Sequence, residues 1–201
     1  DNASFTYASA SYCANNADPT PNISGVTGGT FSSTNGLTIN QNTGVIDLDA
    51  STVGSYVVTY STNAAGTCTN TSNFSVTIHD VPTASSSNVT NVTCNGDGDG
   101  SFSLSGSDGS GSYTYSIDGG TNYTNSSSNT SQSNAVYACR VKDSQGCISP
   151  SINVTITQPD QIVITKGQQT NVDCRGNSTG SAPVTVAGGD GNYTYTWTGT
   201  S

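Results

Sequence analysis

The sequence NGDGDG, residues 95–100, alternates oxygen-bearing side chains with glycines. Oxygens on alternate residues of a tight glycine turn converge on one cation, as in calcium loops that begin Asp-x-Asp-x-Asp-Gly. Asn95, Asp97 and Asp99 are therefore candidate calcium ligands. The alternative is a solvated turn, which we favour because the EF-hand spacing reaches Gly106 where a bidentate Glu is needed, and the chain has no Glu.

Six cysteines in a chain with small cores predict disulfides of a secreted or surface protein. None forms a Cys-x-x-Cys pair, and a single His leaves no zinc set of ordinary spacing. We predict that Cys13 pairs with Cys68, which closes a loop of roughly 55 residues. By the same reasoning Cys94 should pair with Cys147.

Two cysteines are left without a predicted partner. Cys139 occupies an inward position in the alternation Tyr-x-Cys-x-Val, which predicts a buried free thiol. A bond between Cys139 and Cys174, or a bond to another chain, is the alternative.

Catalytic groups are hard to assemble from this sequence. His79 is the only histidine and has no nucleophile motif beside it, and no G-x-S-x-G, P-loop or dinucleotide-binding motif is present. Aspartate pairs such as Asp47 with Asp49 fall in turns or strand ends with no evident cleft. We therefore expect a protein that is not an enzyme and has no catalytic cofactor, with calcium as the one candidate ion.

Charge excludes further classes of partner. The net charge is −9, and only four residues are Lys or Arg, whereas binding to nucleic acid or to an anionic membrane needs clustered basic side chains. The sequence contains no stretch of 18 apolar residues, so it predicts no membrane-spanning helix. The chain opens without the features of a secretion signal, so we expect any such signal to have been removed.

The candidate calcium turn lies in a passage that occurs twice. Shifting the sequence by eighty residues superposes the first copy, Asn91–Ser116, on the second copy, Asn171–Thr196, without a gap. Each copy has a cysteine and a glycine at matching positions, whereas Thr179 replaces Asp99. We infer that the cysteine and the glycine build the passage and that the acids are optional.

Composition predicts an all-β chain, because strong helix formers are scarce and Ser, Thr, Val, Tyr, Gly and Asn dominate. Alternating apolar residues predict strands around Phe102, Tyr113, Tyr137 and Ile152, and the runs SYVVTY and NFSVTI predict two more. Asn35-Gly36 and the sequence NQNTG are hairpin signals. Short strands of this kind are stable only as two sheets that close on each other, so we predict tandem small Ig-like β-sandwich modules stapled by disulfides.

Three modules follow from the repeat and from the prolines near each junction. Residues 1–80 form an Ig-like β-sandwich, 81–159 a second β-sandwich that contains the first copy, and 160–201 the first half of a further module of the same kind. The linkers HDVPTASSSN and TQPDQ interrupt strand pairing at their prolines.

The pattern from the first copy to VYACRVKDSQGC and ITQPD resembles the SprB-type repeat of Bacteroidota surface adhesins. The resemblance covers residues 91–201. The matching residues are Cys94, Gly96, Gly100, Tyr113, Tyr115, Tyr137, Val141, Asp143, Gly146, Cys147, Gln158 and Pro159, and Trp197 fills an aromatic position in the second copy. Cys139 departs from the pattern, which usually has an aliphatic residue there. Residues 1–80 are similar, more weakly, to the Ig-like or cadherin-like modules that accompany such repeats.

The resemblance implies export by a type IX secretion system and a role in surface adhesion and gliding. It implies an extracellular, non-catalytic segment whose partners are neighbouring modules or copies of the same chain in a filament. One alternative is a filament subunit whose incomplete third module is completed by strands of the next protomer. Another is a carbohydrate-binding module of a larger surface enzyme, with a surface polysaccharide as the ligand.

Two surface features accompany these alternatives. Tyr113, Tyr115, Tyr193, Tyr195 and Trp197 could stack on sugar rings, but side chains at period two point to one face, so we expect them to fill the core. The sequence also has N-x-Ser/Thr sequons, which are glycosylation candidates in a secreted protein. We name Asn22, Asn70, Asn88, Asn122 and Asn177 as these candidates.

Overall fold

The computed structural model describes residues 2–63 and 69–199, and within these ranges it contains strands and turns but no helix. This confirms the predicted all-β class. No helix in the described residues could therefore cross a membrane. The chain divides into two compact units. The first comprises Asp1–Ser85, Ser105–Asn125 and Cys139–Ile152, and the second Ser86–Leu104, Ser126–Ala138 and Asn153–Ser201. The module boundaries near residues 80 and 160 stay predictions.

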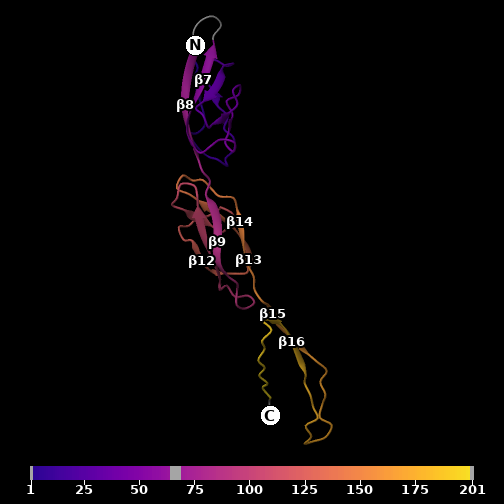
Figure 1. Ribbon diagram of the computed structural model, residues 1–201. Coiled ribbons are helices and arrows are strands. Elements are labelled where there is room, and N and C mark those ends of the chain that lie inside the picture. Colours follow the sequence, from indigo (N-terminus) through magenta and orange to yellow (C-terminus); the bar gives the residue numbers. More distant parts are fainter. Residues whose placement is uncertain (1, 64–68, 200–201) are drawn as a thin grey trace. The chain divides into compact units, whose positions relative to one another are not determined.

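The described residues of the N-terminal segment form eight strands, six short and two long. They are β1 (Phe5–Thr6), β2 (Ser11–Cys13), β3 (Asn22–Ile23), β4 (Thr30–Ser33), β5 (Thr38–Ile39), β6 (Ile46–Asp47), β7 (Gly54–Asn63) and β8 (Thr69–His79). The long strands β7 and β8 lie side by side and antiparallel in a four-stranded sheet of order β2-β8-β7-β4 (Figure 1). The pairs β1-β3 and β5-β6 form two small sheets. Both long strands include runs that the sequence predicts as strands.

One aromatic core joins the four-stranded sheet to the smaller sheets. Phe5 of β1 packs edge-on against Phe31 of β4 at 5.4 Å and against Tyr60 of β7 at 5.8 Å between ring centroids. Ile46 of β6 and Ile78 of β8 are buried in the same cluster. Large rings contribute much of the apolar area that a chain with few Leu residues can bury. This packing is the sandwich that the strand pattern predicts.

The two hairpin signals have different outcomes. The sequence NQNTG does join an antiparallel pair, because Ile39 of β5 lies opposite Ile46 of β6. Asn35-Gly36 does not form a hairpin, since β4 pairs with β7 and places Phe31 opposite Tyr60. The Gly36 carbonyl instead accepts a hydrogen bond from the Thr52 amide at 3.0 Å, and this turn leads the chain from one sheet to another.

The middle of the chain forms two three-stranded sheets. One has the order β12-β10-β9 and the other the order β11-β13-β14. Their strands are β9 (Thr83–Thr90), β10 (Gly100–Ser107), β11 (Thr114–Ser116), β12 (Ser128–Gln132), β13 (Ala135–Lys142) and β14 (Ile152–Ile156). Phe102 of β10 contacts Tyr137 of β13 at 5.3 Å between ring centroids. The alternation predicted for these strands is confirmed at Val141, Val154 and Ile156, which are all buried.

The last part of the chain is an antiparallel pair, β15 (Asp160–Lys166) with β16 (Val184–Gly189). Its apolar side chains remain in contact with solvent: Ile162 is 57% and Ile164 is 68% exposed. In the first copy, by contrast, Phe102 and Leu104 of β10 are buried. The β15-β16 pair therefore presents apolar surface that the described residues leave uncovered.

Candidate functional site

Three cysteines begin the same kind of turn. The carbonyl oxygen of Cys13 accepts a hydrogen bond from the amide of Asn16, three residues later, at 2.9 Å. Cys94 and Cys174 accept the corresponding bond at 3.1 Å each. In the two copies the glycine two residues after the cysteine has a positive φ, 88° and 89°, which only Gly adopts easily. We call these three segments the cysteine turns.

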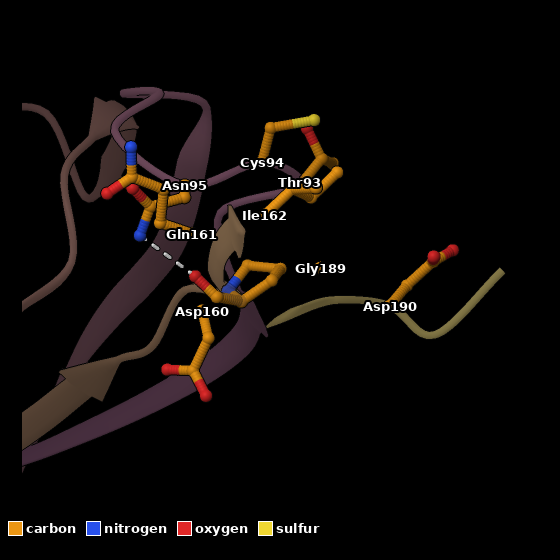
Figure 2. A pocket seen from close by; sticks show the side chains of 9 residues that line it. Thr93, Cys94, Asn95, Asp160, Gln161, Ile162, Gly189 and Asp190 are labelled. Carbon is orange, nitrogen blue, oxygen red and sulfur yellow. Dashed lines mark hydrogen bonds between the residues drawn. The ribbon is translucent and has the colours of Figure 1, made fainter. Parts of the chain in front are cut away.

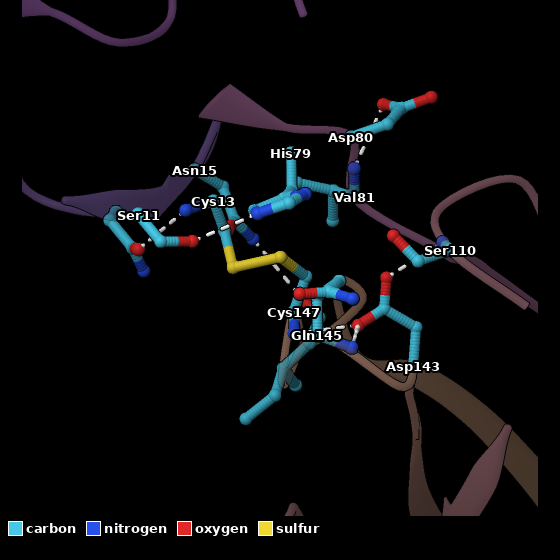
Figure 3. Close-up of a disulfide and its surroundings, with 12 residues drawn as sticks. Ser11, Cys13, Asn15, His79, Asp80, Val81, Ser110, Asp143, Gln145 and Cys147 are labelled. Carbon is cyan, nitrogen blue, oxygen red and sulfur yellow. Dashed lines mark hydrogen bonds between the residues drawn. A yellow bond between two sulfur atoms is a disulfide. The ribbon is translucent and has the colours of Figure 1, made fainter. Parts of the chain in front are cut away.

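One cysteine turn carries a disulfide, and its partner is not the predicted one. Cys13 is bonded to Cys147, with 5.5 Å between their Cα atoms (Figure 3). The predicted Cys13–Cys68 and Cys94–Cys147 bonds are therefore wrong. Cys94 has an exposed thiol, and Cys68 lies outside the described residues.

Cys13 pairs with Cys147 because of the position of β2 in its sheet. β2 runs parallel to β8, which places Cys13 opposite His79, at the point where the chain leaves the N-terminal segment. The turn that contains Cys147 lies at this point, where the Asn15 side chain donates to the Ile148 carbonyl at 3.0 Å (Figure 3). The prediction assumed that each bond stays within one predicted module, whereas this bond joins two.

The turn Asp143–Cys147 is organised by one buried carboxylate. Asp143 is 5% exposed and accepts three backbone amide hydrogens, from Ser110 at 2.9 Å, Gln145 at 3.0 Å and Cys147 at 2.8 Å. Gly146 has a φ of 86°, which closes the turn. The sequence Asp-x-x-Gly-Cys thus fixes the backbone on which the Cys147 sulfur is carried.

The turn of Cys94 is held by the residues Gln158 and Pro159. The Gln158 side-chain oxygen accepts from the Gly96 amide at 2.9 Å. The Pro159 carbonyl accepts from the Asn95 side chain at 3.0 Å (Figure 2). A pocket of about 450 Å³ opens beside this turn. Its lining is Thr93, Cys94, Asn95, Pro159, Asp160, Gln161, Ile162, Gly189 and Asp190 (Figure 2).

The two copies keep one hydrogen-bonded pair but exchange its members. In the first copy the Thr93 hydroxyl donates to the Asp99 carboxylate at 2.5 Å. In the second copy the Thr179 hydroxyl donates to the Asp173 carboxylate at 2.7 Å. Thr93 corresponds to Asp173, and Asp99 to Thr179, so each copy has one Thr and one Asp across its cysteine turn. The second copy lacks the acid at the position of Asp99 but has one, Asp173, at the position of Thr93. The inference that this acid is optional is therefore wrong.

We predict that this exchange can be reproduced in the first copy. Asp99→Thr alone removes the acceptor of the Thr93 hydroxyl and amide, and should lower the melting temperature by on the order of 2 °C. Adding Thr93→Asp gives the arrangement of the second copy and should restore the melting temperature. Scanning calorimetry of the single and double variants measures both effects. A double variant less stable than either single variant would contradict the pairing.

Two of the three candidate calcium ligands are engaged in side-chain hydrogen bonds. Asp99 accepts from Thr93 with both carboxylate oxygens, and the Asn95 amide group is directed at Pro159. In the described part of the chain, no group of three or more His, Cys, Asp or Glu is arranged to hold a metal ion. Calcium binding at Asn95, Asp97 and Asp99 stays a prediction, and a calorimetric titration with CaCl₂ tests it.

Several aspartates accept hydrogen bonds within turns, and protonation of their carboxylates at low pH should lower the stability of the fold. Hydrogen bonds from the Asn122 amide and the Ser116 hydroxyl lower the pKa of Asp118, and those from Thr93 lower the pKa of Asp99. A carboxyl whose pKa is lowered on folding stabilises the fold above its unfolded pKa, about 3.8 here, and loses this contribution as the pH falls.

We therefore expect the free energy of unfolding to decrease steadily below about pH 4. Asp118→Asn should make this decrease shallower, while Asp49→Asn, at an exposed position, serves as the charge-matched control. Urea denaturation between pH 7 and pH 2.5 measures the dependence. A stability that is flat across this range would refute the capping role.

The remaining cysteines differ sharply in accessibility. Cys139 is fully buried, as predicted, and burial raises the pKa of its thiol to about 11. At pH 8 about one such thiol in a thousand is ionised, and alkylation requires the thiolate. We expect iodoacetamide to label Cys94 and Cys174 in the native protein and Cys139 only after unfolding. Peptide mass mapping reports each site, and rapid labelling of native Cys139 would overturn this expectation.

The aromatic residues considered for sugar binding divide into two groups. Tyr113, Tyr115 and Tyr193 are half-buried. The hydroxyls of Tyr113 and Tyr193 donate to the carbonyls of Asp108 at 2.6 Å and Gly188 at 2.5 Å. Tyr195 is 56% and Trp197 is 65% exposed, so the expectation that they fill the core is wrong for these two.

The glycosylation candidates lie mostly at the surface. Asn22, Asn88, Asn122 and Asn177 are exposed, and Asn70 is half-buried. The side chains of Asn122 and Asn177 donate to Asp118 at 2.7 Å and to Asp173 at 2.8 Å. Glycosylation at these five sites stays a prediction.

Short strands in several small sheets and a disulfide between distant turns define the chain as an all-β, Ig-like protein with internal repeats. Comparison with known families identifies the family of these repeats. Residues 86–122 and 167–201 match the model of the SprB repeat, and each segment contains one of the two copies, so both are SprB-type repeats. This confirms the resemblance for these segments. No curated protein matches the chain.

SprB repeats are structural repeats typical of cell-surface or extracellular proteins of Bacteroidota. The family is structural rather than catalytic. In both matched segments the cysteine turn, the Thr–Asp pair and the tyrosine hydroxyl bond described above recur at equivalent positions.

Proposed function

We propose that this chain is a non-catalytic structural segment of a large secreted adhesin or extracellular filament, exported by type IX secretion and used in surface adhesion and gliding. The observation that carries this proposal is the pair of SprB-type repeats, together with the Cys13–Cys147 disulfide, which joins the N-terminal segment to a turn that follows the first repeat. A bond of this kind is stable in an oxidising, extracellular compartment.

Surface labelling of intact cells tests the proposal. Antibodies raised against residues 1–201 should label intact cells of the source bacterium, and brief protease treatment of the cells should remove the signal. Inactivation of type IX secretion should confine the antigen to the cell interior, with a periplasmic marker protein as the control for lysis. Labelling only after permeabilisation of wild-type cells would refute the proposal.

A filament assembled by strand complementation is the second candidate. It is favoured by the exposure of Ile162 and Ile164 on β15, because such apolar surface is usually covered in an assembled protein. Sedimentation velocity at increasing concentration should then show growing polymers, and Ile164→Lys should abolish them. A chain that stays monomeric at 1 mM would exclude this assembly.

Binding to a surface polysaccharide is favoured by one further observation, the exposure of Tyr195 and Trp197. Aromatic faces open to solvent can stack on sugar rings. Trp197 is the only tryptophan, so its fluorescence reports directly on this site. Titration with the purified capsular polysaccharide should shift its emission, and Tyr195→Ala should weaken the effect. Unchanged emission at saturating polysaccharide would remove this candidate.

A further inference from the structure

Two places in the chain repeat one structural plan, and we call them the first and the second junction. The first junction contains the turn of Cys13 and the residues 79–82 and 109–111. The second junction contains the turn of Cys94 and the residues 159–162 and 189–191. The shift of eighty residues that superposes the two copies also places residues 79–82 on 159–162, and 109–111 on 189–191.

The cysteine turn is attached to an equivalent carbonyl at both junctions, by a backbone amide at the first and by a side-chain amide at the second. At the first, the residue after the cysteine, Ala14, donates its amide to the His79 carbonyl at 2.9 Å. At the second, the residue after the cysteine, Asn95, donates its side-chain amide to the Pro159 carbonyl at 3.0 Å. His79 and Pro159 are equivalent positions, so each cysteine is held at the start of the following module.

At the first junction the cysteine turn has a covalent partner. The turn Asp143–Cys147 contacts residues 109–111: Asp143 accepts from the Ser110 amide at 2.9 Å, and the Ser144 amide donates to the Gly111 carbonyl at 3.1 Å. These contacts place Cys147 beside Cys13, to which it is bonded (Figure 3).

At the second junction, the glycines of residues 189–191 have a backbone conformation similar to that of the glycines of residues 109–111 at the first. Gly189 and Gly191 have φ values of 62° and 86°, close to the 60° and 68° of Gly109 and Gly111. Gly189 and Asp190 line the same pocket as the exposed thiol of Cys94 (Figure 2). The single Asp-x-x-Gly-Cys sequence of this chain, at residues 143–147, is already bonded at the first junction.

We propose that Cys94 forms a second junction disulfide with the cysteine of another Asp-x-x-Gly-Cys turn, which docks on residues 189–191 and fills the pocket. The donor is a strand–turn–strand segment like Ala135–Ile156. The rule that follows is that the cysteine turn of one module bonds the Asp-x-x-Gly-Cys turn of the next module. It stands independently of the proposed cellular role.

The covalent step is a thiol–disulfide exchange. The Cys94 thiolate attacks the donor cysteine in its mixed disulfide with glutathione, and a new S–S bond forms between the two cysteines. The bond to glutathione breaks, and glutathione leaves as the thiolate. Glutathione disulfide, which supplies that mixed disulfide, is thus the oxidant, and no other co-reactant is needed.

A synthetic peptide of residues 135–156 provides the test. It carries Cys139→Val, and its remaining cysteine is present as the glutathione mixed disulfide. Incubated with the chain of residues 1–201, it should couple to Cys94 at least tenfold faster than to Cys174, which has the same turn geometry and serves as the control within the molecule. Peptide mass mapping identifies the coupled cysteine, and Cys94→Ser should abolish the fast phase.

Two further variants separate docking from simple thiol reactivity. The peptide with Asp143→Asn loses the carboxylate that accepts the amide at the junction, so its coupling to Cys94 should slow to the rate at Cys174. Asp190→Ser in the chain introduces the residue found at the first junction and removes a like charge facing the peptide carboxylate, so coupling should accelerate. Equal rates at Cys94 and Cys174, or equal rates for both peptides, would overturn the proposal.

Discussion

Replacing Cys13 with serine is expected to lower the free energy of unfolding by about 4 kcal/mol. The Cys13–Cys147 bond spans a sequence separation of 134 residues, and the chain-entropy model gives about 5 kcal/mol for a loop of that length, a value that residual structure in the unfolded chain reduces. Cys13 is the better position to change because it is half-buried, whereas Cys147 is fully buried and a serine there would add an unpaired hydroxyl.

Urea denaturation under non-reducing conditions measures this loss. Cys94→Ser and Cys174→Ser remove exposed thiols and should change the stability by less than about 0.5 kcal/mol, so they control for the substitution itself. Dithiothreitol should destabilise the wild-type protein to the level of Cys13→Ser and leave that variant unchanged. A variant as stable as the wild type would show that the bond does not restrict the unfolded chain.

Asp143→Ala is expected to cost about 3 kcal/mol. The substitution leaves the amides of Ser110, Gln145 and Cys147 without their shared acceptor, and an unsatisfied buried donor costs about 1–3 kcal/mol. The cost stays below the sum of three such losses because Ser110 and Gln145 are exposed enough for water to reach them.

The control for Asp143→Ala is Asp49→Ala, an exposed aspartate that is not among the positive-φ residues, which should change the stability by less than about 0.5 kcal/mol. Asp143→Ala should also slow formation of the Cys13–Cys147 bond during oxidative refolding, because the carboxylate fixes the backbone of Cys147. Equal losses of stability in the two variants would show that the buried carboxylate has no special role.

The strands could be predicted from the sequence because they follow from side-chain alternation. Phe102 and Leu104, or Val154 and Ile156, are buried at period two, as a half-buried strand requires. The pairing of β4 was missed because Asn35-Gly36 is a local signal, whereas the choice between β5 and β7 depends on the packing of Phe31 against Tyr60.

The candidate site was only partly predictable. The sequence shows that cysteines recur in the two copies, but six cysteines allow 15 pairings, and spacing alone does not tell which turns meet in space. The signal for the Thr–Asp pair was present in the aligned copies, since Thr93 and Asp99 both change and exchange residue types at Asp173 and Thr179. Reading the positions one at a time conceals that exchange.

The disulfide between Cys13 and Cys147 also determines how the chain responds to a pulling force. Tension applied at the two ends passes from one sulfur to the other and bypasses every residue between them. Fully extended, the chain between the two cysteines, with its sequence separation of 134, measures roughly 450 Å. The strands it contains can therefore unfold without lengthening the chain, and only reduction of the bond releases this length.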